Sequence, residues 1–598
     1  MTAAPAPSTP DLFARDRQVR RLGPRLGAGQ LIVSQVALAA PVAMAQFGVV
    51  AVTAAATVAA VGLALTWLQF RRRWAYQWLG LWLSTAGHRR RLRVDADATA
   101  LLDWICPGAR IRSVRVAGED AAVLADGTGL TAVFELGDRS AVLVDDGVVL
   151  PSVSEIAALA REAGPVVRAQ LVVSAAPAPT PRVEGTPAAE AYRQLAQGRS
   201  VAATATLLAV RVVADEGDDP DDLLRSLSST VRRIRRRAGI GSARLLGPSA
   251  LAGALVQFAH HLPGQAGLAG WDSTRLGGLR QSCFRLAAPA DPAVCGRLLG
   301  RLGALPALAT TVSALAASGA PGGYPLAVRV AAADTVGLVR AARALEQVAA
   351  EHGLTLRRSD GEQLAGLAAT LPLGGVRPPG FIRSREPRPT SVSAMRPPDA
   401  GLVVGVDRHG VPVLTRLFRA EPTRVLLAGG VRAAQLIALR ALAVGGRLEV
   451  RTARPQAWAP FVRAATAPDA TLSLVAPDAP ATFDADDPLR PLLTVVDAGP
   501  VAHDPSPVGG WHSVLVVRDE LTGLDTGAMT RADLVVLQPL RPDEAALAGS
   551  VLGLGAAAEW LTRIRPDMVG LVSRRTVRWA ALAATPVEER LVGSPARD

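Results

Sequence analysis

The chain has 598 residues, and its 65 basic side chains against 52 acidic ones give a formal charge of +13. Hydrophobic residues make up 49% and charged residues 20%, a balance that excludes a wholly disordered chain and a coiled-coil rod. The sequence contains no Lys, so every basic side chain is an Arg. An ATP-binding P-loop lysine, a Schiff-base enzyme and a Ser-Lys hydrolase are therefore all excluded.

Uncharged residues fill the stretch from 26 to 70, which contains no Asp, Glu, Arg or His. One bilayer crossing needs about 20 residues, so this stretch predicts two transmembrane helices, at 28–46 and 48–68. Basic and aromatic side chains flank the pair, and the positive-inside rule therefore places both ends of the hairpin in the cytoplasm. These flanking residues are Arg20, Arg21, Arg25, Arg71, Arg72, Arg73, Trp74 and Trp78.

We accordingly predict a multi-pass protein of the cell (inner) membrane, with both termini and the soluble domains in the cytoplasm. Residues 1–27 would form a basic N-terminal arm, and 69–97 an Arg- and Trp-rich segment at the membrane interface. Up to Arg93 the chain carries twelve Arg against two Asp, so most of its net charge lies beside the hairpin. The predicted partner of this charge is the lipid bilayer and not nucleic acid.

Short apolar runs alternate with helical patterns over the remainder, which predicts a domain at 98–376 and a C-terminal domain at 400–598. A segment rich in Pro and Arg, 377–399, is the predicted linker between them. Turn signals such as Asp126-Gly127 predict a β-meander early in the first domain, and a helix is expected over 221–237. The predicted fold class is thus a membrane protein, with an N-terminal two-helix transmembrane hairpin followed by cytosolic α/β (mixed α+β) domains.

One stretch of the C-terminal domain has the pattern of a nucleotide site. An apolar strand runs into Gly429 and Gly430 and then into a helix, which is where an α/β protein binds phosphate. Asp497 ends another apolar strand, as a magnesium-binding Asp would. The Lys and the hydroxyl of a P-loop are missing, however, which favours a structural turn or a degenerate, non-hydrolysing relative of a nucleotide fold. We therefore predict no cofactor.

An acidic cluster precedes the helix expected at 221–237. Asp218, Asp219, Asp221 and Asp222 could hold a cation, or imitate the Asp-x-Asp pair with which glycosyltransferases bind a metal and a nucleotide sugar. Acidic residues at a helix start also complement the helix dipole, and that simpler interpretation is preferred. His260-His261 and the three cysteines lack the spacings of a zinc site, so no metal is predicted.

Several segments, taken in order, resemble the EccE family of membrane components of the actinobacterial type VII (ESX) secretion machine. The matching segments are Arg71–Leu81, Asp126–Leu136, Leu223–Arg237, Trp271–Arg285, Glu559–Leu571 and Thr576–Trp579. The resemblance implies a structural subunit of an inner-membrane, hetero-oligomeric complex with the EccB, EccC and EccD components, in which EccC supplies the ATPase activity. It also implies a cytosolic domain similar in fold to glycosyltransferases without an established activity.

The predicted function is therefore that of a non-catalytic component of a type VII secretion complex, needed for protein export. No complete catalytic constellation occurs in the sequence, which supports this interpretation. Two alternatives remain open. One is a membrane-anchored, glycosyltransferase-like enzyme that uses the acidic cluster, and the other is a degenerate nucleotide-binding regulator that uses Gly429 and Gly430.

Overall fold

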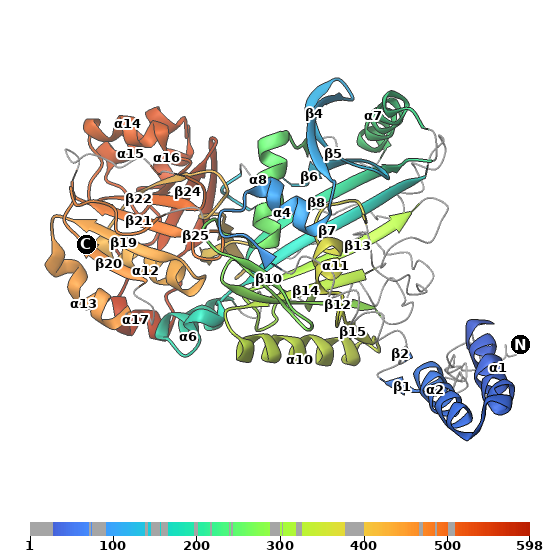
Figure 1. The fold of residues 1–598 in the computed structure, drawn as a ribbon. Helices are drawn as coiled ribbons and strands as arrows, with labels where there is room; N and C mark the ends of the chain where they lie inside the picture. Colours follow the sequence, from blue (N-terminus) through green and yellow to red (C-terminus); the bar gives the residue numbers. More distant parts are fainter. Residues whose placement is uncertain are drawn as a thin grey trace, which may run out of the picture. The chain divides into compact units, whose positions relative to one another are not determined.

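A computed structural model of the chain contains two compact units, Met1–Gly87 and His88–Asp598, and each is described by itself. Figure 1 gives the course of the chain through them. The structure describes residues 28–597 except 71–72, 75–90, 138–140, 145–155, 157–165, 197–200, 216–217, 238–239, 241–242, 287–299, 302, 318–325, 377–399, 466–470, 485–486, 500–506 and 508.

The first unit is a pair of short helices followed by a small hairpin. Helix α1 (Ala28–Ala43) passes into the 3-10 turn η1 (Met44–Phe47) and then helix α2 (Val49–Trp67), and strands β1 (Gln69–Phe70) and β2 (Arg73–Trp74) pair antiparallel. Gly48 makes the bend between the helices, with a φ of 94° that suits glycine. Trp67 donates its indole N–H to Ser34, so the last residue of α2 is joined to the N-terminal half of α1.

The predicted transmembrane hairpin is wrong. Among the described residues, no helix combines the length and the apolar character that a membrane crossing requires. At 1.5 Å per residue, the 16 residues of α1 span about 24 Å and the 19 of α2 about 28 Å, short of the roughly 30 Å hydrocarbon core. The uncharged stretch is long enough for two spans, but η1 and the change to extended backbone after Trp67 shorten its helices.

The second unit begins with a large sheet of 13 strands among the described residues. Its pairings are antiparallel, and its order is β3-β10-β11-β12-β14-β13-β7-β8-β6-β5-β4, with β9 beside β6 and β15 beside β12. The predicted meander is present as β4, β5 and β6. The strands are β3 (Arg91–Leu92), β4 (Arg110–Val116), β5 (Glu119–Asp126), β6 (Gly129–Glu135), β7 (Val167–Pro177), β8 (Val201–Val213), β9 (Arg244–Leu245), β10 (Gly267–Ala269), β11 (Thr274–Leu276), β12 (Leu279–Leu286), β13 (Ala309–Ala317), β14 (Leu326–Ala332) and β15 (Leu356–Arg358).

This sheet is an internal duplication that the sequence did not reveal. From its centre outward the order is β7-β8-β6-β5-β4 on one side and β13-β14-β12-β11-β10 on the other. The registers make Leu171 the counterpart of Val312, because each pairs through its neighbouring strand with a Phe of β6 or β12. Val172 and Ser313 are counterparts that pair with each other. An approximate two-fold axis therefore passes between β7 and β13.

Helices of the described residues cover the two faces of this sheet (Figure 1). Helices α7 (Pro220–Arg237) and α10 (Thr335–Glu351) share one hydrophobic core, and α4 (Ala98–Ile105), α8 (Pro248–Ala259) and α11 (Gln363–Ala369) share another. The helix predicted at 221–237 is thus confirmed as α7, which buries Leu227, Val231 and Ile234. Helices α7 and α10 follow β8 and β14, so they obey the same two-fold relation.

A second sheet, of 10 strands among the described residues, forms the C-terminal region. Its order is β17-β16-β25-β24-β23-β18-β22-β21-β19-β20, and the run from β23 to β20 is parallel. The strands are β16 (Leu402–Val406), β17 (Pro412–Thr415), β18 (Thr423–Ala428), β19 (Arg447–Thr452), β20 (Leu472–Val475), β21 (Leu492–Asp497), β22 (His512–Arg518), β23 (Leu534–Leu537), β24 (Met568–Ser573) and β25 (Thr576–Ala581).

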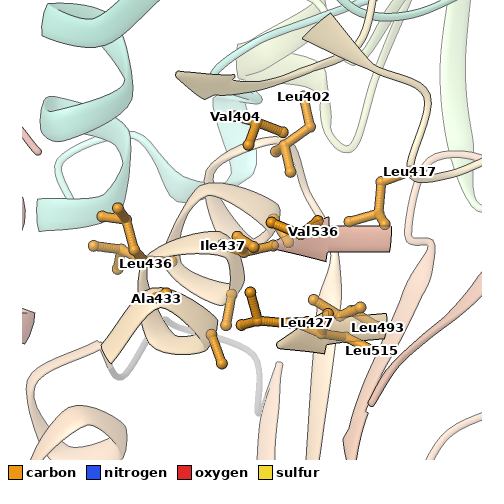
Figure 2. Close-up of a cluster of buried hydrophobic side chains, with 14 of the residues drawn as sticks. Leu402, Val404, Leu417, Leu427, Ala433, Leu436, Ile437, Leu493, Leu515 and Val536 are labelled. Atoms are coloured by element: carbon orange, nitrogen blue, oxygen red, sulfur yellow. The ribbon is translucent and has the colours of Figure 1, made fainter. Parts of the chain in front are cut away.

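Helices cover both faces of the parallel run, as expected of a doubly wound α/β fold. Helices α12 (Val431–Ala443), α13 (Pro455–Ala465) and α17 (Pro586–Val592) pack into one core, and α14 (Thr526–Arg531), α15 (Pro542–Leu552) and α16 (Ala557–Trp560) into the other. Figure 2 shows part of the first core, where Ile437 of α12 lies beside Leu427 and Val536 of the strands and Leu436 points to the other side of the helix. The chain crosses from β18 to β19 in one direction and from β22 to β23 in the other, so the sheet reverses its winding beside β18.

The two sheets belong to one compact unit. Helix α6 (Pro187–Ala196), inserted between β7 and β8, buries Tyr192 in the core of the C-terminal region. The Tyr192 hydroxyl accepts from the Val403 N–H at 3.1 Å and donates to the Gly401 carbonyl at 3.3 Å. The predicted linker 377–399 lies outside the described residues.

Candidate functional site

The turn at Gly429 and Gly430, which the sequence suggested to be structural or a degenerate nucleotide site, lies where a nucleotide fold would place a phosphate-binding turn. Strand β18 ends at Ala428, Gly429 and Gly430 make the turn, and Gly430 is the N-cap of α12. The turn is at the carboxyl end of a central parallel strand, beside the reversal of winding, which is the usual ligand position in open α/β sheets. The strand–glycine–helix backbone thus matches the prediction, and the side chains that lie in the turn decide what it can bind.

The chain itself fills this turn. The side-chain oxygen Oε1 of Gln538 accepts from the Gly430 N–H at 2.8 Å, at the position where a phosphate oxygen would accept. A Cβ atom on Gly429 would clash with the same oxygen, so glycine is required there for close approach. The Gln538 amide donates in turn to the Pro595 carbonyl at 2.6 Å. The neutral side chain of Gln538 therefore lies where a bound phosphate would lie.

Residues of the C-terminal segment lie over the filled turn. The nearest atoms to a Cβ on Gly430 belong to Ala596 and Arg597. The Arg597 guanidinium binds both carboxylate oxygens of Glu544, at 2.6 and 3.0 Å, and also donates to the Pro539 carbonyl. Burial opposes ionisation of Glu544, but Arg597 and the N–H groups of Arg541 and Leu521 outweigh it and lower the pKa of that carboxyl. An ion pair thus anchors the segment.

Asp497 occupies the carboxyl end of β21, as predicted, but its carboxylate is fully engaged. Oδ2 accepts from the Arg454 Nε and the Trp458 Nε1, both at 2.8 Å, and from the Thr452 hydroxyl at 3.2 Å. Oδ1 accepts from another nitrogen of Arg454 at 2.7 Å. Since both oxygens already have charged or polar donors, Asp497 holds β19, β21 and α13 together, and a magnesium ion would have to displace Arg454.

The acidic cluster lies exposed before and within the first turn of α7, as the simpler interpretation predicted. Asp218 accepts from the Asp215 N–H at 2.9 Å, and Asp219 from the Asp221 N–H at 3.4 Å. Asp222 forms an ion pair with Arg225 one turn along α7. Over the described part of the chain, no three His, Cys, Asp or Glu side chains come together in a way that could hold a metal ion. These carboxylates do not converge on a point.

The residues predicted to flank the membrane fall mostly outside the described part of the chain. Arg20, Arg21, Arg25, Arg71, Arg72 and Trp78 are not among the described residues. Arg73 and Trp74 form strand β2, in extended backbone.

Buried ion pairs are the polar features that sequence reasoning missed. Arg440 and Glu588, both almost wholly buried, form a two-pronged pair with N···O distances of 2.7 and 2.9 Å. Arg518 with Asp525, and Arg285 with Glu362, are buried in the same way. Arg440 stands between Leu439 and Ala441, in the apolar run that ends α12. That pattern was the available signal of a buried charge, but it does not indicate the partner.

Comparisons with known proteins give no family. No family model matches the chain, and no curated protein matches it. Among solved structures, it is similar to the genome packaging NTPase B204 of Sulfolobus turreted icosahedral virus 2, in complexes with AMP and with ATP-gammaS. The identities are 9% and 10%, and each match covers 27% of this chain and 98% of the viral one with a TM-score of 0.20. Similarity at this level does not establish a common fold.

Proposed function

We propose that the chain is a non-catalytic scaffold subunit of a multiprotein complex. The observation that carries the proposal is that the nucleotide-like turn at Gly429 and Gly430 is filled by the chain's own side chains. Gln538 occupies the phosphate position at Gly430, and Arg454 binds the carboxylate of Asp497. A catalytic site leaves its reacting groups open to a ligand, whereas these groups serve the packing of the C-terminal region.

The complex that we propose is a type VII secretion machine, with EccB, EccC and EccD as neighbours. The support for this part is the resemblance of the ordered segments to the EccE family, together with the Lys-free composition, which leaves ATP hydrolysis to another subunit. The proposal does not depend on membrane-spanning helices in this chain.

Co-purification tests the assembly. An affinity-tagged full-length chain, produced together with EccB, EccC and EccD, should elute with all three at a fixed ratio. Elution without any of them would refute membership in that complex. A tagged variant with Gln538→Ala should co-purify equally well, because its nucleotide-like turn takes no part in assembly.

A second experiment separates a scaffold from an enzyme. Replacing Asp218, Asp219, Asp221 and Asp222 together by Asn removes every carboxylate that a glycosyltransferase-like mechanism would need. We expect secretion to persist in cells that carry only this variant, since the four side chains are exposed and serve the start of α7. Loss of secretion with normal levels of the variant, or heat of binding when the unmodified chain is titrated with Mn²⁺ and UDP- or GDP-sugars, would favour the enzyme.

A further inference from the structure

A cavity of about 670 Å³ lies inside the second unit, between the antiparallel sheet and loops of the C-terminal region. Its volume is within the range of about 300–1,000 Å³ that is typical of small-molecule sites, which also favour such boundaries. Helix α8 and the turn at Gly277–Gly278 line it from the first region. Ala420–Glu421, Asp487–Arg490 and Gly510–Trp511 line it from the second.

One face of α8 contributes very small side chains to the wall, beside the larger Val256, Gln257 and Phe258 of the same helix. Ala250, Gly253 and Ala254 have the i, i+3, i+4 spacing of a single helix face, and all three line the cavity. A Cβ added to Gly253 would have no atom within 4 Å, so the space beside it is open. Leu207, Leu246 and Pro263 line the cavity too. The body of a ligand would therefore meet an apolar surface.

Some of the charged residues that line the cavity form ion pairs, and others do not. Arg244 donates to the buried Glu135 at 2.8 Å, so these two charges neutralise each other. Asp487 accepts from the Leu489 N–H at 2.9 Å, within its own loop. Arg490, Asp487 and Glu421 form no ion pair with any residue that the structure describes. The cavity thus offers a cation where Arg490 enters its lining.

A second guanidinium, that of Arg447, lies near Arg490, and the charges of Asp487 and Asp484 act on it with the opposite sign. Arg447 donates from Nε to the backbone carbonyl of Arg490 at 3.0 Å, which brings the two side chains into one neighbourhood. Burial first, and then the charge of Arg490, lower the pKa of Arg447. Two like charges held together are stabilised when an anion joins them.

We propose that this cavity binds a small organic anion, with its apolar body against Ala250, Gly253 and Ala254 of α8 and its anionic group at Arg490. A guanidinium recognises a carboxylate or a phosphate through paired, charge-assisted hydrogen bonds. The site is separate from the glycine turn and requires no catalytic chemistry.

Calorimetry on the full-length chain tests the proposal with probes that share one apolar body. These are 4-(trifluoromethyl)benzoate, 4-(trifluoromethyl)phenyl phosphate and the neutral 4-(trifluoromethyl)benzamide. We expect at least one of the two anions to bind at a single saturable site, about tenfold or more tightly than the amide, because charge-assisted bonds to Arg490 are lost with the amide. The anion that binds identifies the favoured headgroup. Equal affinity of all three probes, or no saturable binding of either anion, would overturn the proposal.

Two variants locate the binding. Ala254→Leu fills the cavity from its apolar side and should weaken the anion and the amide alike by about tenfold or more. Its control, Ala350→Leu, places the same side chain at an exposed position on α10 and should change nothing. Arg490→Gln removes the cation without touching α8, and should abolish only the preference for the anion. If Ala254→Leu and Arg490→Gln, shown by melting curves to be folded, both bind the anion as the unmodified chain does, the site is elsewhere and the proposal is wrong.

Discussion

Both sheets of the second unit contain buried ion pairs, but one buried cation of the antiparallel sheet, Arg329, is stabilised in a different way. In the C-terminal region, the buried guanidiniums of Arg440 and Arg518 are matched by the carboxylates of Glu588 and Asp525. In the antiparallel sheet, Arg329 is as deeply buried, but it donates to the Phe258 carbonyl and the Thr311 hydroxyl, and no described carboxylate forms an ion pair with it. Its compensation comes from the C-terminal end of α8, where the carbonyl groups carry partial negative charge.

The difference has a consequence for neighbouring groups. A carboxylate carries a full negative charge and neutralises a buried cation, whereas a helix C-terminus carries only about half a negative charge. One cation is enough to neutralise that partial charge. Burial lowers the pKa of Arg329 to about 10. His260, the C-cap of the same helix, is buried with both ring nitrogens unpartnered, and burial together with the Arg329 charge lowers its pKa to about 3. The buried ion pairs thus satisfy their charges within each pair, whereas the site of Arg329 and His260 at the end of α8 leaves polar atoms without partners.

The largest effect is expected from removing the cation of a buried ion pair. Arg440→Met leaves the wholly buried Glu588 without its cation, and two carbonyls, of Val404 and Leu582, lose their donor. We expect the free energy of unfolding to fall by about 3–5 kcal/mol, measured by urea denaturation. The exposed pair Arg340–Glu184 is the control, and Arg340→Met should cost less than about 1 kcal/mol. Similar losses for both variants would contradict the comparison.

The next effect concerns the backbone beside the unpartnered histidine. Gly277 has a φ of 57°, and a Cβ there would clash with the His260 carbonyl oxygen. Gly277→Ala should therefore destabilise the chain by about 2–4 kcal/mol, through left-handed strain plus overpacking. Gly553→Ala is the control, because its φ is 66° but its Cβ would meet no atom nearer than 3.9 Å. It should cost only about 1 kcal/mol in thermal unfolding. An equal cost would mean that strain alone acts at both.

A somewhat smaller effect is expected from removing the ion pair that anchors the C-terminal segment. Arg597→Ala removes the cation of Glu544, which keeps its bonds from the N–H groups of Arg541 and Leu521. Because those two donors remain, we expect a loss of about 2–3 kcal/mol in urea denaturation, less than for Arg440→Met. Arg541→Ala, which breaks the exposed pair with Glu520, should leave the stability nearly unchanged. A loss as small for Arg597→Ala would show that the segment is not anchored.

What could be predicted from the sequence was local. The meander and α7 followed from turn residues and helical periodicity, and the strand–glycine–helix turn at Gly429 was placed correctly because its pattern occupies consecutive residues. The pairing of Val172 with Ser313 joins strands far apart in the chain, and no local signal encodes it. Gln538 and Arg597 likewise reach the turn from distant elements. The transmembrane prediction failed for the related reason that composition gave the length of an apolar stretch but not its breaks.

The smallest expected effect is a pH dependence of the free energy of unfolding, which comes from His260 at the end of α8. The pKa of His260 is about 3 in the folded chain and about 6.5 when unfolded, so its contribution to stability is complete above pH 6.5 and is lost as the pH falls toward 3. Between pH 6.5 and 5, before most carboxyl groups titrate, the free energy of unfolding should fall by about 1 kcal/mol per pH unit. His260→Asn should flatten this slope, since Asn tolerates the left-handed backbone found there, with a φ of 54°. His409→Asn, at an exposed position, should leave the slope unchanged. If the unmodified chain and His260→Asn give parallel curves in urea denaturation at each pH, then His260 is protonated in the folded chain, and the end of α8 accommodates two cations after all.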